Sequence, residues 1–169
     1  MKILTSICVL LFAYTQTTPA SMPLTPIHPY PPNPYCNRTL DSFSMPVVEC
    51  PNDGFMYQVN LECIDRCLAT YRACMLQAFD TACDQYNQAN INYETAMRLS
   101  LQEYDLCFAA AQTVIEREAC RTTVLRNFNE ALQVLDQDRD TIETDFVINT
   151  HECKRQFGLC AGDCCIKVW

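Results

Sequence analysis

The sequence is poor in glycine, histidine and positive charge. Only 3 glycines occur in 169 residues, which leaves little room for phosphate-binding loops or a turn-rich β-sandwich. With 12 Lys and Arg against 20 Asp and Glu, the net charge is −8, which argues against nucleic acid and anionic membrane surfaces as partners. The only histidines are His28 and His151, so the chain offers little for a histidine-based zinc site.

Glycine and proline are both absent between Phe55 and Phe157. A stretch of this length without backbone breakers predicts long α-helices. Eight of the 9 prolines lie between Ser21 and Pro51, where we expect extended, polyproline-like and exposed backbone. We interpret this part as a stiff spacer, and a docking peptide for a proline-recognising domain is the alternative.

The first 20 residues have the features of a secretory signal. Lys2 precedes an apolar run from Ile3 to Ala13, and small residues for cleavage precede Ser21. A run of about 11 residues is too short for a membrane-spanning helix. The predicted organisation is a signal peptide at 1–20, a Pro-rich extended segment at 21–54 and a helical domain at 55–169. We therefore expect a secreted, extracellular protein without a membrane span, glycosylated at the sequon that begins at Asn37.

Apolar residues of the helical domain recur at the 3–4 spacing of a coiled-coil seam. The seam of the first half is Ile64, Cys67, Tyr71, Cys74, Ala78, Ala82, Tyr86, Tyr93, Met97, Leu101 and Tyr104. The seam of the second half is Leu125, Phe128, Leu132, Leu135, Ile142, Phe146, Cys153 and Phe157. Apolar residues outside both seams are Leu68, Met75, Val124, Val147 and Ile148. We expect these to meet the N-terminal segment or to form exposed strips for self-association.

Capping signals place the ends of two helices. Thr113 and Glu116 fit a capping box, which predicts a turn at residues 110–113, and Asn60 is a plausible N-cap for the first helix. The run Asn87–Asn92 contains three asparagines, which compete for backbone hydrogen bonds. The first helix is therefore expected to bend or break there, if anywhere.

The 13 cysteines contain a mirror symmetry. Loss of Cys8 with the signal peptide leaves twelve, enough for six disulfides. Facing residues of an antiparallel hairpin have a constant sum of residue numbers. Four pairs share the sum 227, centred on the predicted turn: Cys63–Cys164, Cys67–Cys160, Cys74–Cys153 and Cys107–Cys120. Facing seam positions also meet the Cα separation that a disulfide needs, so the sequence predicts these four disulfides.

Four cysteines remain outside this symmetry: Cys36, Cys50, Cys83 and Cys165. By the same sum Cys83 faces Thr144, so it has no partner within the hairpin. The extended N-terminal segment is long enough for Cys50 to reach Cys83 and for Cys36 to return to Cys165. A local Cys36–Cys50 disulfide is the alternative, and it leaves Cys83 and Cys165 for intermolecular bonds.

The predicted fold is all-α: a long antiparallel helical hairpin cross-linked by disulfides, or an elongated small bundle if the first helix breaks. The spacing of Cys63, Cys67, Cys160 and Cys164 resembles the paired C-x3-C pattern of small cystine-linked helical hairpins. The same spacing would suit zinc, but an oxidising compartment favours disulfides. We therefore expect no metal site and no cofactor.

Candidate catalytic groups are few. His151 and Glu152 are neighbours, but they lack the sequence context of secreted phospholipases, and a lone histidine on a charged helix is usually a surface residue. Asp136, Asp138 and Asp140 resemble the start of a calcium-binding loop, but position six is not glycine and the run lies inside a seam. We expect a solvated acidic face that attracts calcium weakly.

These observations predict a secreted, non-enzymatic protein. A structural or extracellular-matrix component suits a stiff, acidic, cross-linked rod. A secreted binding effector, such as a venom, defence or host-interaction protein, is the alternative. Either works through an extracellular protein partner or through self-association, using its long faces and the Pro-rich segment.

Overall fold

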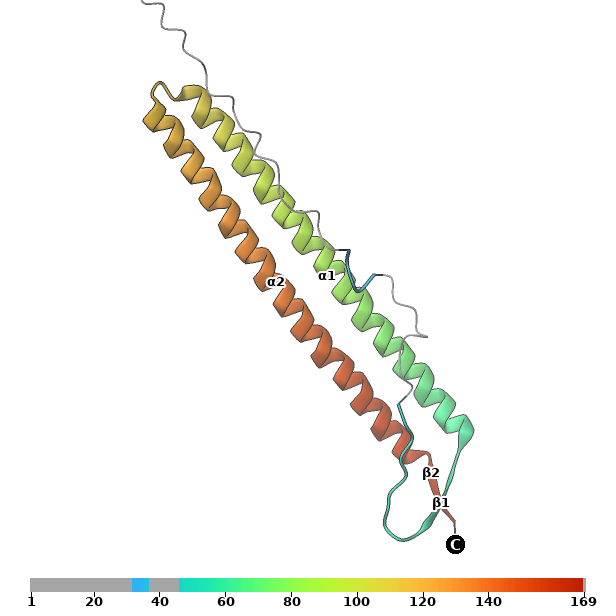
Figure 1. The fold of residues 1–169 in the computed structure, drawn as a ribbon. Coiled ribbons are helices and arrows are strands. Elements are labelled where there is room, and N and C mark those ends of the chain that lie inside the picture. The colour runs from blue at the N-terminus through green and yellow to red at the C-terminus, as the bar shows by residue number, and fades with distance from the viewer. Residues whose placement is uncertain (1–31, 37–45, 169) are drawn as a thin grey trace, which may run out of the picture.

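The computed structural model describes residues 32–36 and 46–168, which form two long antiparallel helices and a two-stranded sheet (Figure 1). In chain order the elements are β1 (Met56–Val59), α1 (Leu61–Ala110), α2 (Val114–Asp163) and β2 (Cys165–Val168). The predicted antiparallel helical hairpin is confirmed. The predicted signal peptide, the sequon at Asn37 and most of the Pro-rich segment lie outside the described residues.

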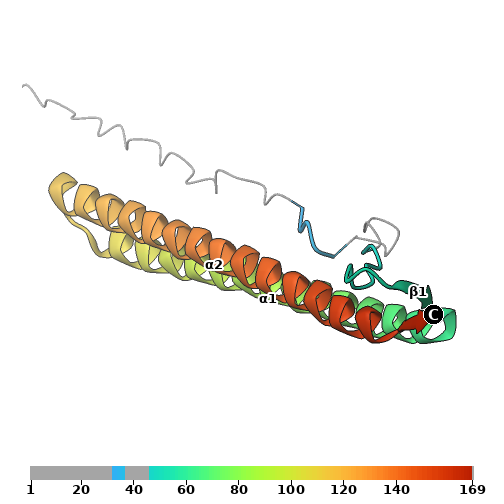
Figure 2. The ribbon, with the colours of Figure 1, turned by 90° about the horizontal axis from the view of Figure 1, so that it is seen from below.

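The hairpin has the shape of a rod. Each helix contains 50 residues and therefore measures about 75 Å at the usual rise per residue. The α1–α2 turn closes one end and the small sheet closes the other, as the two perpendicular views show (Figures 1 and 2). Within the described ranges, neither helix has a stretch both long and apolar enough to cross a membrane.

Both predicted helix starts are confirmed. The side chain of Asn60 accepts a hydrogen bond from the amide of Cys63 at 3.1 Å. The Thr113 hydroxyl accepts from the amide of Glu116 at 3.2 Å, while the Glu116 carboxylate accepts from the amides of Thr113 and Gln112. These backbone bonds hold the pKa of Glu116 below its usual value. The capping box thus starts α2 at the residue that the sequence indicates.

Helix α1 does not break at its asparagine-rich run. Asn90 accepts a hydrogen bond from the Arg139 guanidinium of α2 at 3.1 Å, and Gln88 donates to the Asn92 side chain at 2.9 Å. These bonds engage the side chains that would otherwise compete for the backbone. Ala89 is buried against α2 in the same run. Side-chain bonds and packing therefore keep the helix continuous, and the expected alternative of an elongated small bundle is not found.

The core consists of two clusters of buried residues along the helix interface. The cluster near the sheet contains Ile64, Cys67, Tyr71, Met75, Phe79, Cys153, Phe157, Ala161 and Cys164. The central cluster contains Ala82, Tyr86, Ala89, Leu135 and Ile142. Partly buried Phe146 packs against both. The interface is therefore a narrow apolar strip, as expected for two helices packed side by side.

The predicted seam of α2 is wrong toward the turn. Leu125 and Leu132 are 44% and 42% exposed, whereas Val124 is 2% exposed. From Leu135 toward the turn, the buried stripe continues through partly buried Ala131 and Phe128 to Val124. A strict seven-residue repeat drifts on a straight helix with 3.6 residues per turn, so the inward-facing position shifts.

The apolar residues predicted to lie outside both seams differ in burial. Met75 is 2% exposed and belongs to the cluster near the sheet, and Leu68 packs against that cluster. Val147 and Ile148 are 47% and 58% exposed. The expectation of off-seam positions is therefore wrong for Met75 and Val124, and it holds for Val147 and Ile148.

The two short strands were not expected from the sequence, which predicts an all-α domain at 55–169. β1 pairs antiparallel with β2, with Met56 opposite Val168 and Val59 opposite Cys165. The ladder continues into the helix end, where the Asn60 amide donates to the Cys164 carbonyl at 2.9 Å. The pairing follows from the hairpin, because it brings the chain segments before α1 and after α2 to the same end of the rod.

Candidate functional site

Six disulfides join the described cysteines, and four of them are the predicted ladder. Cys63–Cys164, Cys67–Cys160, Cys74–Cys153 and Cys107–Cys120 have Cα separations from 5.5 to 5.8 Å. Among the described residues, the constant sum of residue numbers therefore identifies every disulfide that joins α1 to α2 or to its C-cap, Cys164. Covalent bonds hold the helices together both at the turn and near the sheet.

The predicted pairing of the other four cysteines is wrong. Cys36 is bonded to Cys83, and Cys50 is bonded to Cys165. Neither the expected pairs, Cys50–Cys83 and Cys36–Cys165, nor a local Cys36–Cys50 bond is present. No described cysteine is left for an intermolecular bond.

The path of residues 50–60 explains why Cys50 is bonded to Cys165 instead of Cys83. Gly54 has a φ of +84°, a left-handed conformation that glycine adopts without strain. β1 then pairs with β2 before α1 begins. These residues form a turn and the first strand of the sheet, so Cys50 stays at the end of the rod that carries the sheet, where it is bonded to Cys165.

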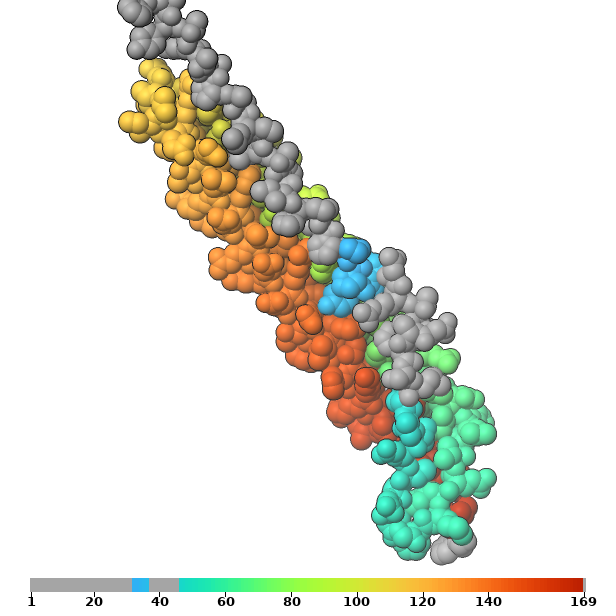
Figure 3. Space-filling view, viewed as in Figure 1, coloured from blue at the N-terminus to red at the C-terminus, as the bar shows by residue number. Residues whose placement is uncertain are grey.

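Residues 32–36 are fixed to the middle of the rod, where they lie along α1 (Figure 3). The Tyr35 ring lies 6.1 Å from the Tyr86 ring and 5.0 Å from the Phe146 ring. Asn33 donates to the carbonyl of Cys83 at 3.0 Å and to the side chain of Asn87 at 2.9 Å. Ring packing and hydrogen bonds therefore surround the Cys36–Cys83 disulfide.

The cysteines with zinc-like spacing do lie together. The sulfur atoms of Cys63, Cys67 and Cys164 are all within 4.8 Å of one another. Cys67 and Cys164 belong to different disulfides, and their sulfurs are 3.7 Å apart. Zinc needs thiolate ligands, so these atoms are not zinc ligands while both disulfides are intact.

His151 and Glu152 do not act as a pair in this structure. The Glu152 carboxylate accepts two hydrogen bonds from Arg155, at 2.6 and 2.7 Å, and a third from Gln156 at 3.0 Å. The bonds from Arg155 and Gln156 lower the pKa of Glu152 to about 2. His151 is exposed on the same helix. The carboxylate therefore serves a surface ion pair instead of orienting the imidazole.

The three aspartates of the calcium-like run are all on α2. Asp136 and Asp140 are exposed, and Asp138 is half-buried and faces a groove between the helices. The helix spreads these carboxylates around its axis, so they do not converge as the ligands of a calcium loop do. Loose attraction of calcium by the acidic surface stays a prediction.

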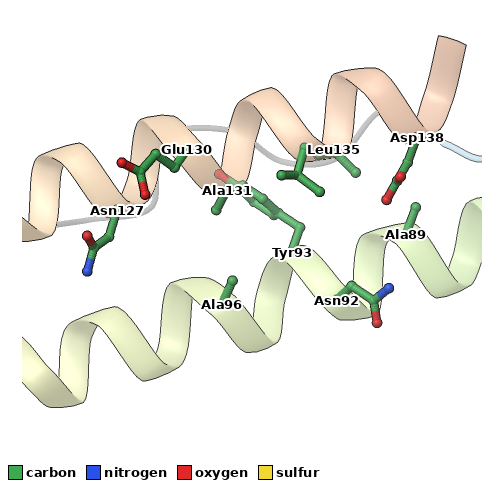
Figure 4. A pocket seen from close by; sticks show the side chains of 10 residues that line it. Ala89, Asn92, Tyr93, Ala96, Asn127, Glu130, Ala131, Leu135 and Asp138 are labelled. Atoms are coloured by element: carbon green, nitrogen blue, oxygen red, sulfur yellow. The ribbon is translucent and has the colours of Figure 1, made fainter.

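A groove lies beside Asp138, between the two helices. One section has a volume of about 290 Å³ and lies between residues 89–96 of α1 and 127–138 of α2. A second section of about 230 Å³ extends it toward Gln85 and Asp145, and the two share Ala89, Asn92 and Asp138. In the close-up, the side chains of Tyr93, Ala131 and Leu135 lie between the helices (Figure 4).

The groove combines an apolar floor with an acidic rim. Its apolar lining residues are Ala89, Tyr93, Ala96, Ala131, Val134, Leu135 and Ile142. Glu130, Asp138 and Asp145 supply the charge, and no Lys, Arg or His lines either section. This arrangement suits a partner that presents apolar side chains together with positive charge.

Sequence reasoning missed this groove. Its floor exists because alanine stands where larger residues would fill the space between the helices. Ala82, Ala89 and Ala96 recur every seven residues, and Ala89 and Ala96 line the groove together with Ala131 of α2. That alanine repeat was the available signal, but a short side chain in a seam is equally compatible with close helix packing.

No protein-family model, no curated protein and no solved structure matches the chain.

Proposed function

We propose that the chain is a secreted, non-enzymatic structural protein of the extracellular matrix that works as a stiff, cross-linked rod. The observation that carries the proposal is the distribution of the disulfides. Cys107–Cys120 closes the turn, Cys36–Cys83 fixes the middle, and four further disulfides hold the half of the rod nearer the sheet. Disulfides persist in oxidising compartments outside the cell.

The cross-links compensate for a small core. Each helix buries only one stripe, and two packed helices have little interior. A disulfide typically stabilises a domain by about 2–4 kcal/mol, and closely nested ones add less than their sum. A protein held in this way keeps its shape in conditions that would unfold an unlinked hairpin. This persistence suits a matrix component.

The non-enzymatic part of the proposal rests on the polar groups discussed above. Glu152 is engaged by Arg155, and the three aspartates do not converge. The groove carries carboxylates and amides without a histidine or cysteine in its lining. General acid–base or nucleophilic catalysis usually needs a nucleophile or base and a second acid or base within hydrogen-bonding reach of each other.

Localisation in the tissue that expresses the protein tests this proposal. We expect antibody staining in extracellular material, and we expect most of the protein to stay insoluble in physiological saline and to be released by denaturant with a reductant. A protein recovered entirely as a soluble component of a glandular secretion would contradict the matrix role.

The acidic groove favours a second candidate, a secreted effector that binds a partner surface. The same experiment separates the two, because an effector is found free in the secretion of a gland or of immune tissue. In both candidates, the protein functions by binding through its folded surface.

A further inference from the structure

Among the described residues, those outside the two helices leave the groove uncovered. Residues 32–36 bond to or stack on Cys83, Tyr86, Asn87 and Phe146, and Tyr35 also packs against the central cluster, whose Ala89, Leu135 and Ile142 line the groove. All lining residues belong to α1 and α2. The described part of the N-terminal segment therefore borders the groove at Tyr35 but contributes no lining residue to either section.

The dimensions of the groove indicate an elongated occupant. Its lining extends from Gln85 to Ala96 on α1 and from Asn127 to Asp145 on α2, which corresponds to about 17 and 27 Å along the two axes. A helix of about 11 to 18 residues covers that distance. The trough between two packed helices also matches the surface of a third, because alanine floors allow its side chains to enter as knobs.

The negative charge of the groove determines the sign of the charge that a partner must carry. Glu130 has Arg126 nearby, at 3.8 Å in an exposed pair that contributes little. No ion pair of Asp138 or Asp145 is present among the described residues. A second copy of the chain would bring a net charge of −8 to this acidic rim, and like charges oppose association.

We propose that the groove binds an amphipathic, positively charged helix of another protein. This inference deepens the proposed function, because it gives the rod the partner through which it is held. Glu130, Asp138 and Asp145 are 8 and 7 residues apart on α2, or about 12 and 10.5 Å. The partner helix therefore carries Lys or Arg at intervals of seven or eight residues along one edge of an apolar stripe.

A synthetic probe tests the proposal with the full chain, secreted from a eukaryotic host with its disulfides intact. The probe is a 21-residue fluorescent peptide, helical by design, with Leu and Ala on one face and Lys at seven-residue intervals. We expect fluorescence anisotropy to report binding that weakens as salt is raised. A peptide with Glu in place of Lys should not bind.

Matched variants place the binding site. Asp138→Asn with Asp145→Asn should weaken binding at least about tenfold at low salt. The control, Asp136→Asn with Asp140→Asn, makes the same charge change at exposed positions of the same helix and should alter binding less than about twofold. Equal losses in both variants would overturn the proposal, because the peptide would then be held by the acidic surface in general.

A second pair of variants tests the apolar floor. Ala131→Trp fills the groove and should abolish binding, whereas Ala119→Trp, at an exposed position of the same helix, should not. Circular dichroism of both variants checks that the helices are retained. Unchanged binding by a folded Ala131→Trp variant would contradict the proposal.

The same binding assay distinguishes two other occupants of the groove, a simple polycation and a second copy of the chain. Displacement of the peptide by spermine at equal concentration would show that the groove recognises charge alone, and a dimer that Ala131→Trp dissociates would show a self-interface. Either result overturns the proposal. These measurements use purified protein, so their failure leaves the matrix role standing, and the localisation experiment can fail while the groove still binds its helix.

Discussion

Tyr71 lies in an environment that does not suit its hydroxyl. The residue is 5% exposed, and its ring packs 5.5 Å from the ring of Phe157. The hydroxyl oxygen is buried without a hydrogen-bond partner among the described residues, and burial raises the pKa of the phenol. An unsatisfied buried hydroxyl destabilises a fold by about 1–3 kcal/mol.

Tyr71→Phe is therefore expected to leave the free energy of unfolding unchanged or to raise it by up to about 1 kcal/mol. Guanidinium denaturation of the oxidised protein measures this. The control is Tyr57→Phe, which removes an exposed hydroxyl that donates to Asp53 at 2.7 Å and should not be stabilising. A loss above about 1 kcal/mol for Tyr71→Phe would mean that the hydroxyl is satisfied, for instance by an ordered water.

The Glu152–Arg155 pair predicts a pH dependence. The folded protein lowers the pKa of Glu152 to about 2 from a usual value of 4.5, so the pair stabilises above pH 4.5 and loses its effect as the pH falls toward 2. Because both side chains are exposed, the effect is small. We expect Glu152→Gln to lower the melting temperature slightly at pH 6 and not at pH 2. Arg155→Gln should show the same trend, and a deficit that persists at pH 2 in either variant would contradict this account.

At the scale of elements, local sequence decides where the helices start. The Thr113 box and the Asn60 cap are complete in the structure, and each satisfies backbone amides that a helix leaves unpaired. The asparagine run of α1 shows the opposite case, in which a local tendency to break the helix is overruled by Arg139 from the neighbouring helix. Local signals therefore hold unless a contact from another element replaces them.

Thr113→Ala should lower the free energy of unfolding by about 0.5–2 kcal/mol, because it removes the acceptor for the Glu116 amide. Thr113→Ser keeps the hydroxyl and should retain most of the stability. Since Cys107–Cys120 holds the turn closed, hydrogen exchange should also detect faster opening of the first turn of α2. Equal losses in the two variants would show that the hydroxyl is not the stabilising group.

At the scale of the whole molecule, the N-terminal disulfides decide how the segment before α1 lies on the rod. Cleavage after Lys and Arg leaves Cys36 in a peptide that ends at Arg38, and it places Cys50 in residues 39–66 and Cys83 in residues 73–98. We expect the Cys36 peptide to be linked to residues 73–98 under non-reducing conditions. Mass spectrometry after deglycosylation measures this, and a Cys36 peptide linked to residues 39–66 or 156–167 would show that the pairing is wrong.

The rod also has a characteristic size in solution. A uniform rod about 75 Å long has a radius of gyration near 22 Å, whereas a compact domain of 169 residues has one of about 15 Å. Small-angle X-ray scattering of the oxidised monomer should give about 22 Å or more. A value near 15 Å would mean that the hairpin folds back on itself.

The sequence by itself determined the features that depend on periodicity and local chemistry. The absence of glycine and proline from Phe55 to Phe157 indicates helices, the Thr113–Glu116 box places the turn, and the constant sum of cysteine numbers pairs α1 with α2. Each of these signals arises from a helix that advances by a constant step. One turn and one register are then enough to relate any residue of α1 to its neighbour on α2.

Only the tertiary structure decided the features without such a repeat. The pairing of Cys36 and Cys50 depends on the path of a non-helical segment, which Gly54 and the β1–β2 ladder redirect. The burial of Val124 in place of Leu125 depends on how far the seam drifts along a straight helix. The groove depends on which alanines of the two helices come to face each other. In each case the outcome is set by contacts between residues far apart in the chain, and local propensities carry no information about those contacts.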